Sequence, residues 1–342
     1  MIEGPSVDER GASCPPTIPI PPSHVPTRAV PVSPNADIIH RYDAATAKHG
    51  FLDHALRATA YLPQLWRSRA LLWNFARREL LGRFRGSIGG LFWVLVQPIF
   101  QFVVYFLVFG ILFAPRHELA TSGPSTKYAL FLFSGILFFN TLTEAIGNAL
   151  SSVLANGNLV KKVAFPCELL PLSPVLVAHA VYIVGAVVLV LVGLTLGDIH
   201  LGLASLCWPL LLLCSLVMAT GLGLLLAAAD VFARDVGHLY RIFAMAWFFL
   251  SPVFWQLELI QDKAVALGAP WITNLLLLNP AFPLLMAARQ VIGLEDMGDG
   301  SSSLVPLSLG GNLLASALWA VVLFSIGYGF FMSRKHKFAD LV

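Results

Sequence analysis

Long apolar runs are the feature that most constrains this chain. A helix needs about 20 apolar residues to cross the hydrocarbon core of a bilayer, and several runs approach or exceed that length. The chain is 57% apolar and 12% charged, whereas about a quarter of the residues in an ordinary soluble domain are charged. We therefore predict an all-α integral membrane protein with about six transmembrane helices, at residues 91–114, 129–151, 169–196, 203–229, 239–257 and 313–332.

One further apolar stretch, 274–294, is interrupted by Pro280 and Pro283. It is too short and too broken for a comfortable span, because proline removes a helical hydrogen bond. We expect one or two re-entrant or interfacial helices here, before the last span.

The chain before the first span divides into two parts. Residues 1–50 hold nine of the 22 prolines and few aromatic residues, which predicts a disordered cytoplasmic tail. The tail has no basic segment followed by an apolar one, so we expect no cleaved signal peptide. Residues 51–90 contain an apolar series at helical spacing among arginines, which favours an amphipathic interface helix on a membrane surface over a solvated helix of a small soluble domain. The apolar series is Leu65, Leu72, Ala76 and Leu80.

Basic residues set the orientation. With the N-terminus inside, all but four of the 22 Lys and Arg residues fall in cytoplasmic segments, as the positive-inside rule requires. Six spans then leave both termini in the cytoplasm. The four basic residues outside are Arg116, Lys127, Lys263 and Arg289.

Catalytic and metal-binding signatures are missing from the sequence. It contains no G-x-x-x-x-G-K-[ST] phosphate cradle, and no H-E-x-x-H or G-x-S-x-G motif. The four cysteines lack ligand spacing, so we interpret them as small apolar residues. Glu144 and His179 lie within predicted spans, where ionisable groups are often functional; packing or a wet vestibule is favoured over a proton relay, which needs more such groups.

Four motifs carry a resemblance to a known family. They are RE at 78–79 with RFRGSIGGLFW at 83–93 and QP at 97–98, NLVKKVAFP at 158–166, LNP with FP at 278–283, and FAD at 338–340. In this order they resemble the permeases of type-2 ABC exporters of O-antigen, capsular polysaccharide and teichoic acid, over residues 60–342. The chain departs from the family pattern at Cys167, where a basic residue is common, and in its longer Pro-rich tail.

The resemblance implies a permease domain, at 91–342, that is not itself an enzyme. It implies a homodimer in the bacterial cytoplasmic (inner) membrane, with a separate nucleotide-binding ABC ATPase subunit that binds ATP and magnesium; this chain itself needs no cofactor or metal, and nucleic acid is not a partner. The implied interface-helix residues are Arg78, Glu79, Arg83 and Arg85. The implied ATPase-coupling residues are Asn158, Leu159, Val160, Lys161, Lys162 and Phe165. Without the surrounding motif, Lys161 and Lys162 are also explained by the positive-inside rule, which places basic residues in cytoplasmic loops.

Aromatic residues near the outer ends of the first and fifth spans have two explanations. They fit an interfacial aromatic belt, and they also fit a pathway on which the apolar faces of sugar rings slide. The pathway candidates are Tyr105, Phe109, Trp247 and Phe254.

The predicted function is export of a lipid-linked polysaccharide, such as O-antigen, capsule or a teichoic-acid-like polymer, across the cytoplasmic membrane. Membrane lipid is an expected partner. The alternative within the family is export of a small lipid or drug. A secondary transporter predicts inverted repeats and paired ionisable residues at the midplane, and neither is visible. A membrane-bound transferase would need a polar site, for which the only cluster is Asp230, Arg234, Asp235 and His238.

Overall fold

The computed structural model describes residues 61–84, 86–90, 92–105, 107–108, 111, 126–162, 166–197, 199–269, 271–294 and 308–342. Within these ranges the chain is helical and contains no strand, as the sequence predicts. All of them belong to one compact unit. The Pro-rich tail 1–50 lies outside the described residues.

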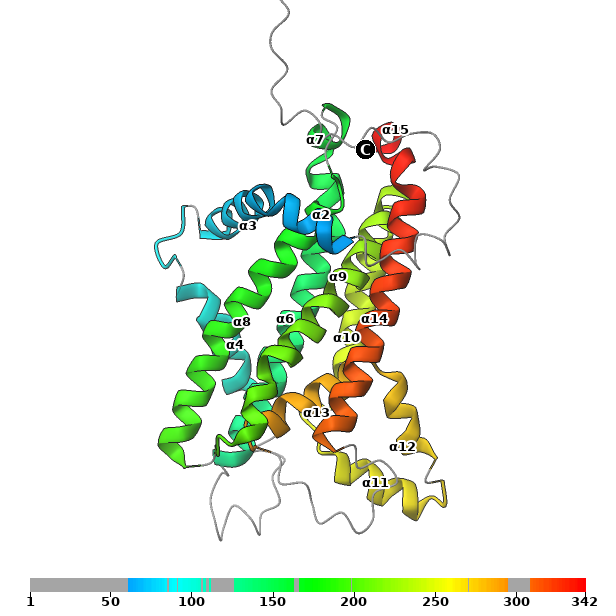
Figure 1. Cartoon of the computed structure of the whole chain (residues 1–342). Helices are drawn as coiled ribbons and strands as arrows, with labels where there is room; N and C mark the ends of the chain where they lie inside the picture. The colour runs from blue at the N-terminus through cyan, green and yellow to red at the C-terminus, as the bar shows by residue number, and fades with distance from the viewer. Residues whose placement is uncertain are drawn as a thin grey trace, which may run out of the picture. The chain divides into compact units, whose positions relative to one another are not determined.

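Among the described residues, four helices are long and apolar enough to cross a membrane. They are α6 (Thr126–Ala155), α8 (Leu169–Leu196), α9 (Trp208–Phe232) and α14 (Leu309–Arg334), with the 3-10 helix η5 (Leu203–Cys207) leading into α9. They contain the second, third, fourth and last predicted spans, which are confirmed as helices of spanning length. Figure 1 shows them running alongside one another, and α6 packs against α8 and α9 while α9 packs against α14.

The first and fifth predicted spans are shorter helices. α4 (Phe92–Tyr105) has 14 residues and α10 (Val236–Leu250) has 15. A helix of 15 residues rises about 22 Å, less than the roughly 30 Å of a hydrocarbon core. α10 ends before residue 257 because Ser251 adopts extended backbone ahead of Pro252, a position where proline disfavours helix.

The spanning helices meet through both large and small residues. Phe139 and Leu142 of α6 lie in one buried apolar cluster with Ala178 of α8 and Met218 of α9. Between α9 and α14, a Cβ atom on Gly327 would lie 1.9 Å from the carbonyl oxygen of Gly221. Glycine at these positions lets the backbones of α9 and α14 touch, as small residues do in other membrane helix pairs.

Short helices lie before the last span. The stretch 274–294, where one or two helices are expected, holds the end of α12 (Ile272–Leu275), the 3-10 helix η6 (Leu276–Leu278) and α13 (Ala281–Val291). α11 (Leu257–Ala266) precedes this stretch and was not predicted. Pro280 precedes α13 and Pro283 lies in its first turn, where backbone N–H groups have no partner within the helix, so these prolines begin the helix instead of breaking it. α13 is buried along almost its whole length and packs against α6, α9 and α14.

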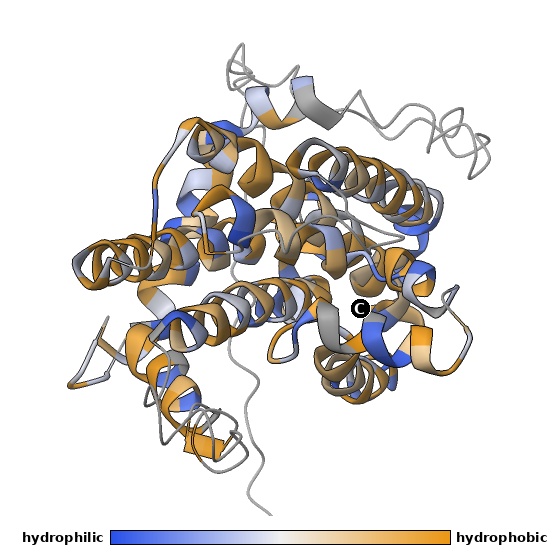
Figure 2. Cartoon of the chain, turned by 90° about the horizontal axis from the view of Figure 1, so that it is seen from below, coloured by the Kyte–Doolittle hydropathy of each residue, from blue (hydrophilic) through white to orange (hydrophobic). Residues whose placement is uncertain are grey.

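The outward sides of the long helices are apolar. Val187 and Leu191 of α8, and Leu318 and Val321 of α14, are exposed. In Figure 2 the hydrophobic colour covers most of the helical ribbons around the bundle. This surface suits contact with lipid tails, and together with the four long helices it identifies a multi-pass membrane protein.

Candidate functional site

In the described part of the chain, two helices precede the first predicted span. α2 (Tyr61–Arg67) and α3 (Arg69–Phe84) lie where the sequence predicts an interface helix, and a break at Ser68 separates them. The predicted apolar face does not lie open to lipid, however, since Ala76 is buried and Leu65 and Leu72 pack against a core cluster. The exposed side carries Trp66 and Trp73, which are 72% and 68% exposed. The prediction of a helix was right, but the face assigned to the membrane contacts protein.

Polar residues of α3 bind α6. Arg83 forms an ion pair and hydrogen bond with Glu144 of α6, and its guanidinium also lies 4.0 Å from the carboxylate of Glu79. One turn further along α6, Asn148 Nδ2 lies 3.5 Å from Glu144 Oε1. Glu144 is thus neutralised by Arg83, which favours a structural role over the proton relay. It also means that the Arg83 guanidinium contacts protein.

A second contact ties α3 to the end of α6. Arg78 Nη2 donates to Asn156 Oδ1 at 2.9 Å, and Asn156 separates α6 from α7 (Gly157–Lys162). The Asn156 carbonyl accepts the backbone N–H groups of Leu159 and Val160, so this residue also begins α7. Any displacement of α7 therefore acts directly on the residue that Arg78 holds.

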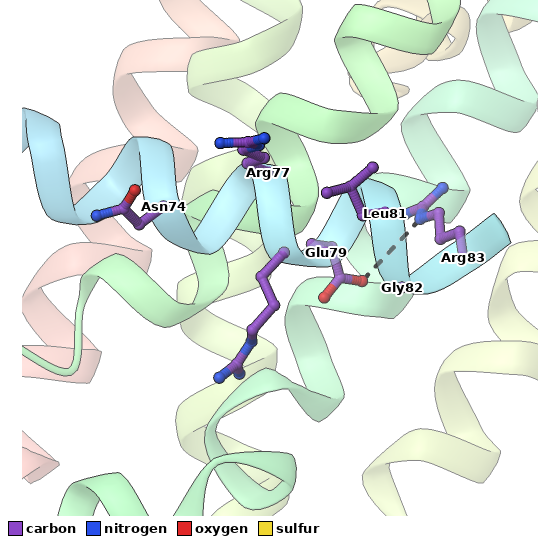
Figure 3. Close-up of a pocket in the computed structure, with 7 residues that line it drawn as sticks. Asn74, Arg77, Glu79, Leu81, Gly82 and Arg83 are labelled. Carbon is purple, nitrogen blue, oxygen red and sulfur yellow. Dashed lines mark ion pairs between the residues drawn. The ribbon is translucent and has the colours of Figure 1, made fainter. Parts of the chain in front are cut away.

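A hollow of about 730 Å³ runs beside α3. Figure 3 shows Glu79 and Arg83 pointing toward each other, with Arg77 on a different side of the helix. The lining of this hollow carries three guanidinium groups and one carboxylate, so the local charge of the hollow is positive. The lining residues are Asn74, Arg77, Arg78, Glu79, Leu81, Gly82 and Arg83.

The predicted coupling residues do not share one face of α7. Asn158 and Lys161 are exposed, whereas Val160 packs against the core cluster at this end of the bundle. Leu159 is half-buried, the Lys162 side chain is not described, and Phe165 lies outside the described residues. Asn158 and Lys161 are therefore the predicted residues that the structure leaves open to a partner.

The core cluster at the α7 end joins segments from the whole chain. Phe338, at the start of α15 (Phe338–Leu341), is fully buried, and its ring centroid lies 5.1 Å from that of Phe331. Val342 packs against the same cluster, and a Cβ on Gly157 would lie 2.3 Å from Val342 Cγ1. α15 and α7 are therefore adjacent, as Figure 1 also shows. The sequence flagged FAD at 338–340 as a motif but gave it no role.

A buried ion pair fixes the same region. Lys335, in the 3-10 helix η7 (Lys335–Lys337), donates from Nζ to Glu168 Oε2 at 2.6 Å, and Glu168 has no exposed surface. Burial raises the pKa of the neighbouring Cys167 thiol, and the Lys335 ammonium offsets part of that rise. Sequence reasoning missed Glu168, although a carboxylate directly before a predicted span was the available signal.

The four predicted pathway aromatics lie in different surroundings. Trp247 is 4% exposed and packs edge-on against Phe139, so it belongs to the core and does not face a pathway. Phe254 is half-buried and stacks on Phe248. Tyr105 ends α4 with its side chain not described, and Phe109 lies outside the described residues.

Asn279, in the LNP motif, joins α10 to α13. Its Oδ1 accepts from Trp247 Nε1 at 2.7 Å and from the backbone N–H of Ala281 at 3.0 Å. Its Nδ2 donates to the Leu250 carbonyl at 3.2 Å and to Ser251 Oγ at 2.9 Å. Both donor hydrogens and both acceptor positions of the amide are therefore used.

Two ionisable residues within the bundle also have structural partners. His179 Nδ1 lies 2.9 Å from the Val175 carbonyl, and Nε2 lies 3.0 Å from Ser215 Oγ. Because a carbonyl only accepts, Nδ1 carries a proton, and the ring links α8 to α9. Arg289 of α13 is buried, donates to the Phe131 and Val253 carbonyls, and lies over the Phe131 ring at 3.5 Å.

The residues considered for a transferase differ in exposure. Asp230 is buried, whereas Asp235 and His238 are exposed, and His238 Nδ1 lies 3.3 Å from Arg241 Nη2. Across the described ranges, no group of three or more His, Cys, Asp or Glu residues is placed to hold a metal ion.

Comparison with known proteins gives consistent matches. The model of the ABC-2 type transporter family matches residues 70–292. The O-antigen export system permease protein RfbA of Myxococcus xanthus is 26% identical over 279 residues, which cover 82% of this chain and 98% of that protein. Two O-antigen export system permease proteins of Klebsiella pneumoniae, also named RfbA, are 21% and 20% identical, each over 80% of this chain and 95% of the relative.

Proposed function

The chain belongs to the ABC-2 type transporter family, and from that premise we propose that it is the membrane subunit of an ATP-driven exporter of lipid-linked polysaccharide. Permeases of this family are inner-membrane proteins that pair with a nucleotide-binding ATPase subunit and have no catalytic activity of their own. The observation that carries the substrate class is the similarity to O-antigen export permeases along almost their entire length. The polymer would be an O-antigen, a capsule or a teichoic-acid-like chain.

The proposed transport unit is a homodimer with two ATPase subunits. In this proposal each copy contributes six membrane segments, the four long helices and the shorter α4 and α10, and both termini face the cytoplasm. The distribution of basic residues supports this orientation, because α7 and the segment after α14 lie at one end of the bundle and both are basic.

The contacts between α3, α6 and α7 support a route for the motion. Asn158 and Lys161 of α7 meet the ATPase subunit, and ATP-driven closure of that subunit displaces α7. Asn156 moves with α7 and displaces Arg78 through their hydrogen bond. The Arg83–Glu144 ion pair keeps α3 in contact with α6 during this motion. The motion thus reaches the α3–α4 junction, beside which lipid-linked substrate enters between the protomers.

The proposed polymer pathway keeps Tyr105, Phe109 and Phe254 and adds two exposed rings of α10, Phe243 and Phe249. Trp247 supports these rings from the core, since it packs beside Phe243 and is held by Asn279. Aromatic faces offer weak and repeated contacts to sugar rings, which suits a chain that must slide.

Deletion of this chain with complementation tests the assignment. Cells lacking it should lose surface polysaccharide and accumulate the lipid-linked polymer inside, and the full-length chain should restore export only together with its ATPase subunit. Unchanged surface polysaccharide with loss of an exported small lipid or drug would instead support the alternative within the family.

A further inference from the structure

The segment after α14 folds back onto α7 and ends in exposed side chains. We propose that α15 and α7 form one composite docking surface for the nucleotide-binding ATPase subunit, so that the C-terminal helix shares a contact otherwise assigned to α7 alone. This inference rests on the proposed function, because it names a further part of the same subunit interface. We call this surface the α7–α15 surface; its residues are Asn158, Lys161, Lys337, Asp340 and Leu341.

Two independent contacts hold α15 in place. Phe338 inserts its whole ring into the core cluster, against Phe331 and Phe232. Three residues before Phe338, Lys335 pairs with the fully buried Glu168, which directly precedes the first residue of α8. A terminal segment normally frays unless it is tied down. These two anchors therefore give α15 a fixed position relative to the rest of the bundle.

α7 is in direct contact with this fixed helix. Val342 occupies the space that a side chain at residue 157 would need, so Gly157 permits the close approach. Val160 and Val342 also pack against the same core cluster. A partner that displaces α7 must consequently displace α15 as well, or slide α7 along it.

The exposed side chains of the α7–α15 surface suit a soluble protein partner. Leu341 is 47% exposed and is the one exposed large apolar side chain among the described residues of α7 and 335–342. The α7–α15 surface also carries the exposed Lys161, Lys337 and Asp340, and no ion pair joins these three residues to one another or to other described residues. A surface that combines an exposed apolar side chain with charged ones suits a protein interface, whereas lipid tails would exclude the charges. The basic excess calls for an acidic face on the ATPase subunit.

Site-specific photo-crosslinking in membranes tests the proposal. A photoreactive residue at Leu341 and, separately, at Lys161 should each crosslink to the ATPase subunit in the assembled transporter. The control position is Leu267, which is 75% exposed just beyond α11, at the opposite end of the bundle, and should give no such product. If Lys161 crosslinks to the ATPase subunit but Leu341 reaches only lipid or a second copy of this chain, the inference is wrong and the proposed function stands. If neither position does, both are wrong.

An affinity measurement provides the second arm. Leu341→Asp should weaken binding of the ATPase subunit to the permease in nanodiscs by about tenfold, and Lys161→Glu with Lys337→Glu should weaken it more at low than at high salt. Leu267→Asp should leave the affinity unchanged. Equal affinities for Leu341→Asp and the native chain, with both proteins folded and monodisperse, would overturn the proposal.

Discussion

The ammonium of Lys335 donates to the carboxylate of Glu168 at 2.6 Å, across 167 residues of sequence, and Glu168 is wholly buried. The pair links α8 to α14 at the α7 end of the bundle, because Glu168 precedes α8 and Lys335 follows α14. Burying an unpaired charge is far more costly than burying a pair.

Removing one partner of this pair should destabilise the protein strongly. Lys335→Met removes the ammonium that Glu168 pairs with while its carboxylate stays buried, and we expect a loss of about 3–5 kcal/mol of stability. Thermal denaturation of the purified chain in detergent measures this. Lys337→Met, which removes an exposed ammonium two residues away, is the matched control and should change little. Equal melting temperatures for the two variants would contradict the structural role of Glu168.

The Arg83–Glu144 pair should matter for coupling more than for stability. Glu144 is 48% exposed and Arg83 20%, so the pair contributes at most about 1 kcal/mol to stability. We expect Arg83→Glu to lower export severalfold at near-normal protein level, because two carboxylates then repel across the α3–α6 contact. The charge swap Arg83→Glu with Glu144→Arg should recover much of the export. Surface polysaccharide per unit of protein is the readout, and a swap no better than the single variant would argue against the pair.

Asn279 should be intolerant of substitution. Asn279→Ala removes an amide that makes four hydrogen bonds and leaves Trp247 Nε1 buried without an acceptor. We expect a loss of about 2–4 kcal/mol, since each unmet buried group costs roughly 1–3 kcal/mol. Asn274→Ala, at an exposed position on α12, is the control. Protease resistance in membranes compares the two, and equal resistance would show that the LNP motif has another role.

Substitutions of Trp247 and of its neighbours on α10 should have different effects, because Trp247 packs in the core and the neighbours are exposed. Trp247→Ala opens a cavity in the core and should cost about 3–5 kcal/mol, seen as loss of protein from the membrane. Phe249→Ala and Phe243→Ala should leave protein level near normal and lower surface polysaccharide in a graded, additive way. If both exposed rings can be removed together without effect on export, they face lipid and the pathway runs elsewhere.

Sequence patterns could predict the helices well because the relevant signals are local. Apolar length predicted α6, α8, α9 and α14, and Pro252 marked where α10 stops, although the predicted span ran past it. Helix α3 lies in the stretch where the apolar series predicted a helix, and α7 coincides with the start of the NLVKKVAFP motif. Each of these features depends on neighbouring residues only.

Contacts between distant segments could not be predicted in the same way. Apolar periodicity identified the face with Leu72 and Ala76, but it cannot distinguish a face buried on protein from one buried in lipid, because both environments are apolar. Glu168 pairs with a residue at the far end of the chain, and no local pattern indicates that partner. Trp247 likewise has the sequence pattern of a belt or pathway aromatic, because its hydrogen bond to Asn279, 32 residues away, is not visible in a local pattern.

ATP-driven transport in reconstituted vesicles tests the central claim most directly. Vesicles holding this chain and its ATPase subunit should translocate lipid-linked polysaccharide when ATP is supplied on the side of α7 and α15, and vesicles holding either protein alone should not. The isolated chain should hydrolyse no ATP. Translocation by this chain alone, driven by an ion gradient, or ATP turnover by the purified chain would contradict the account.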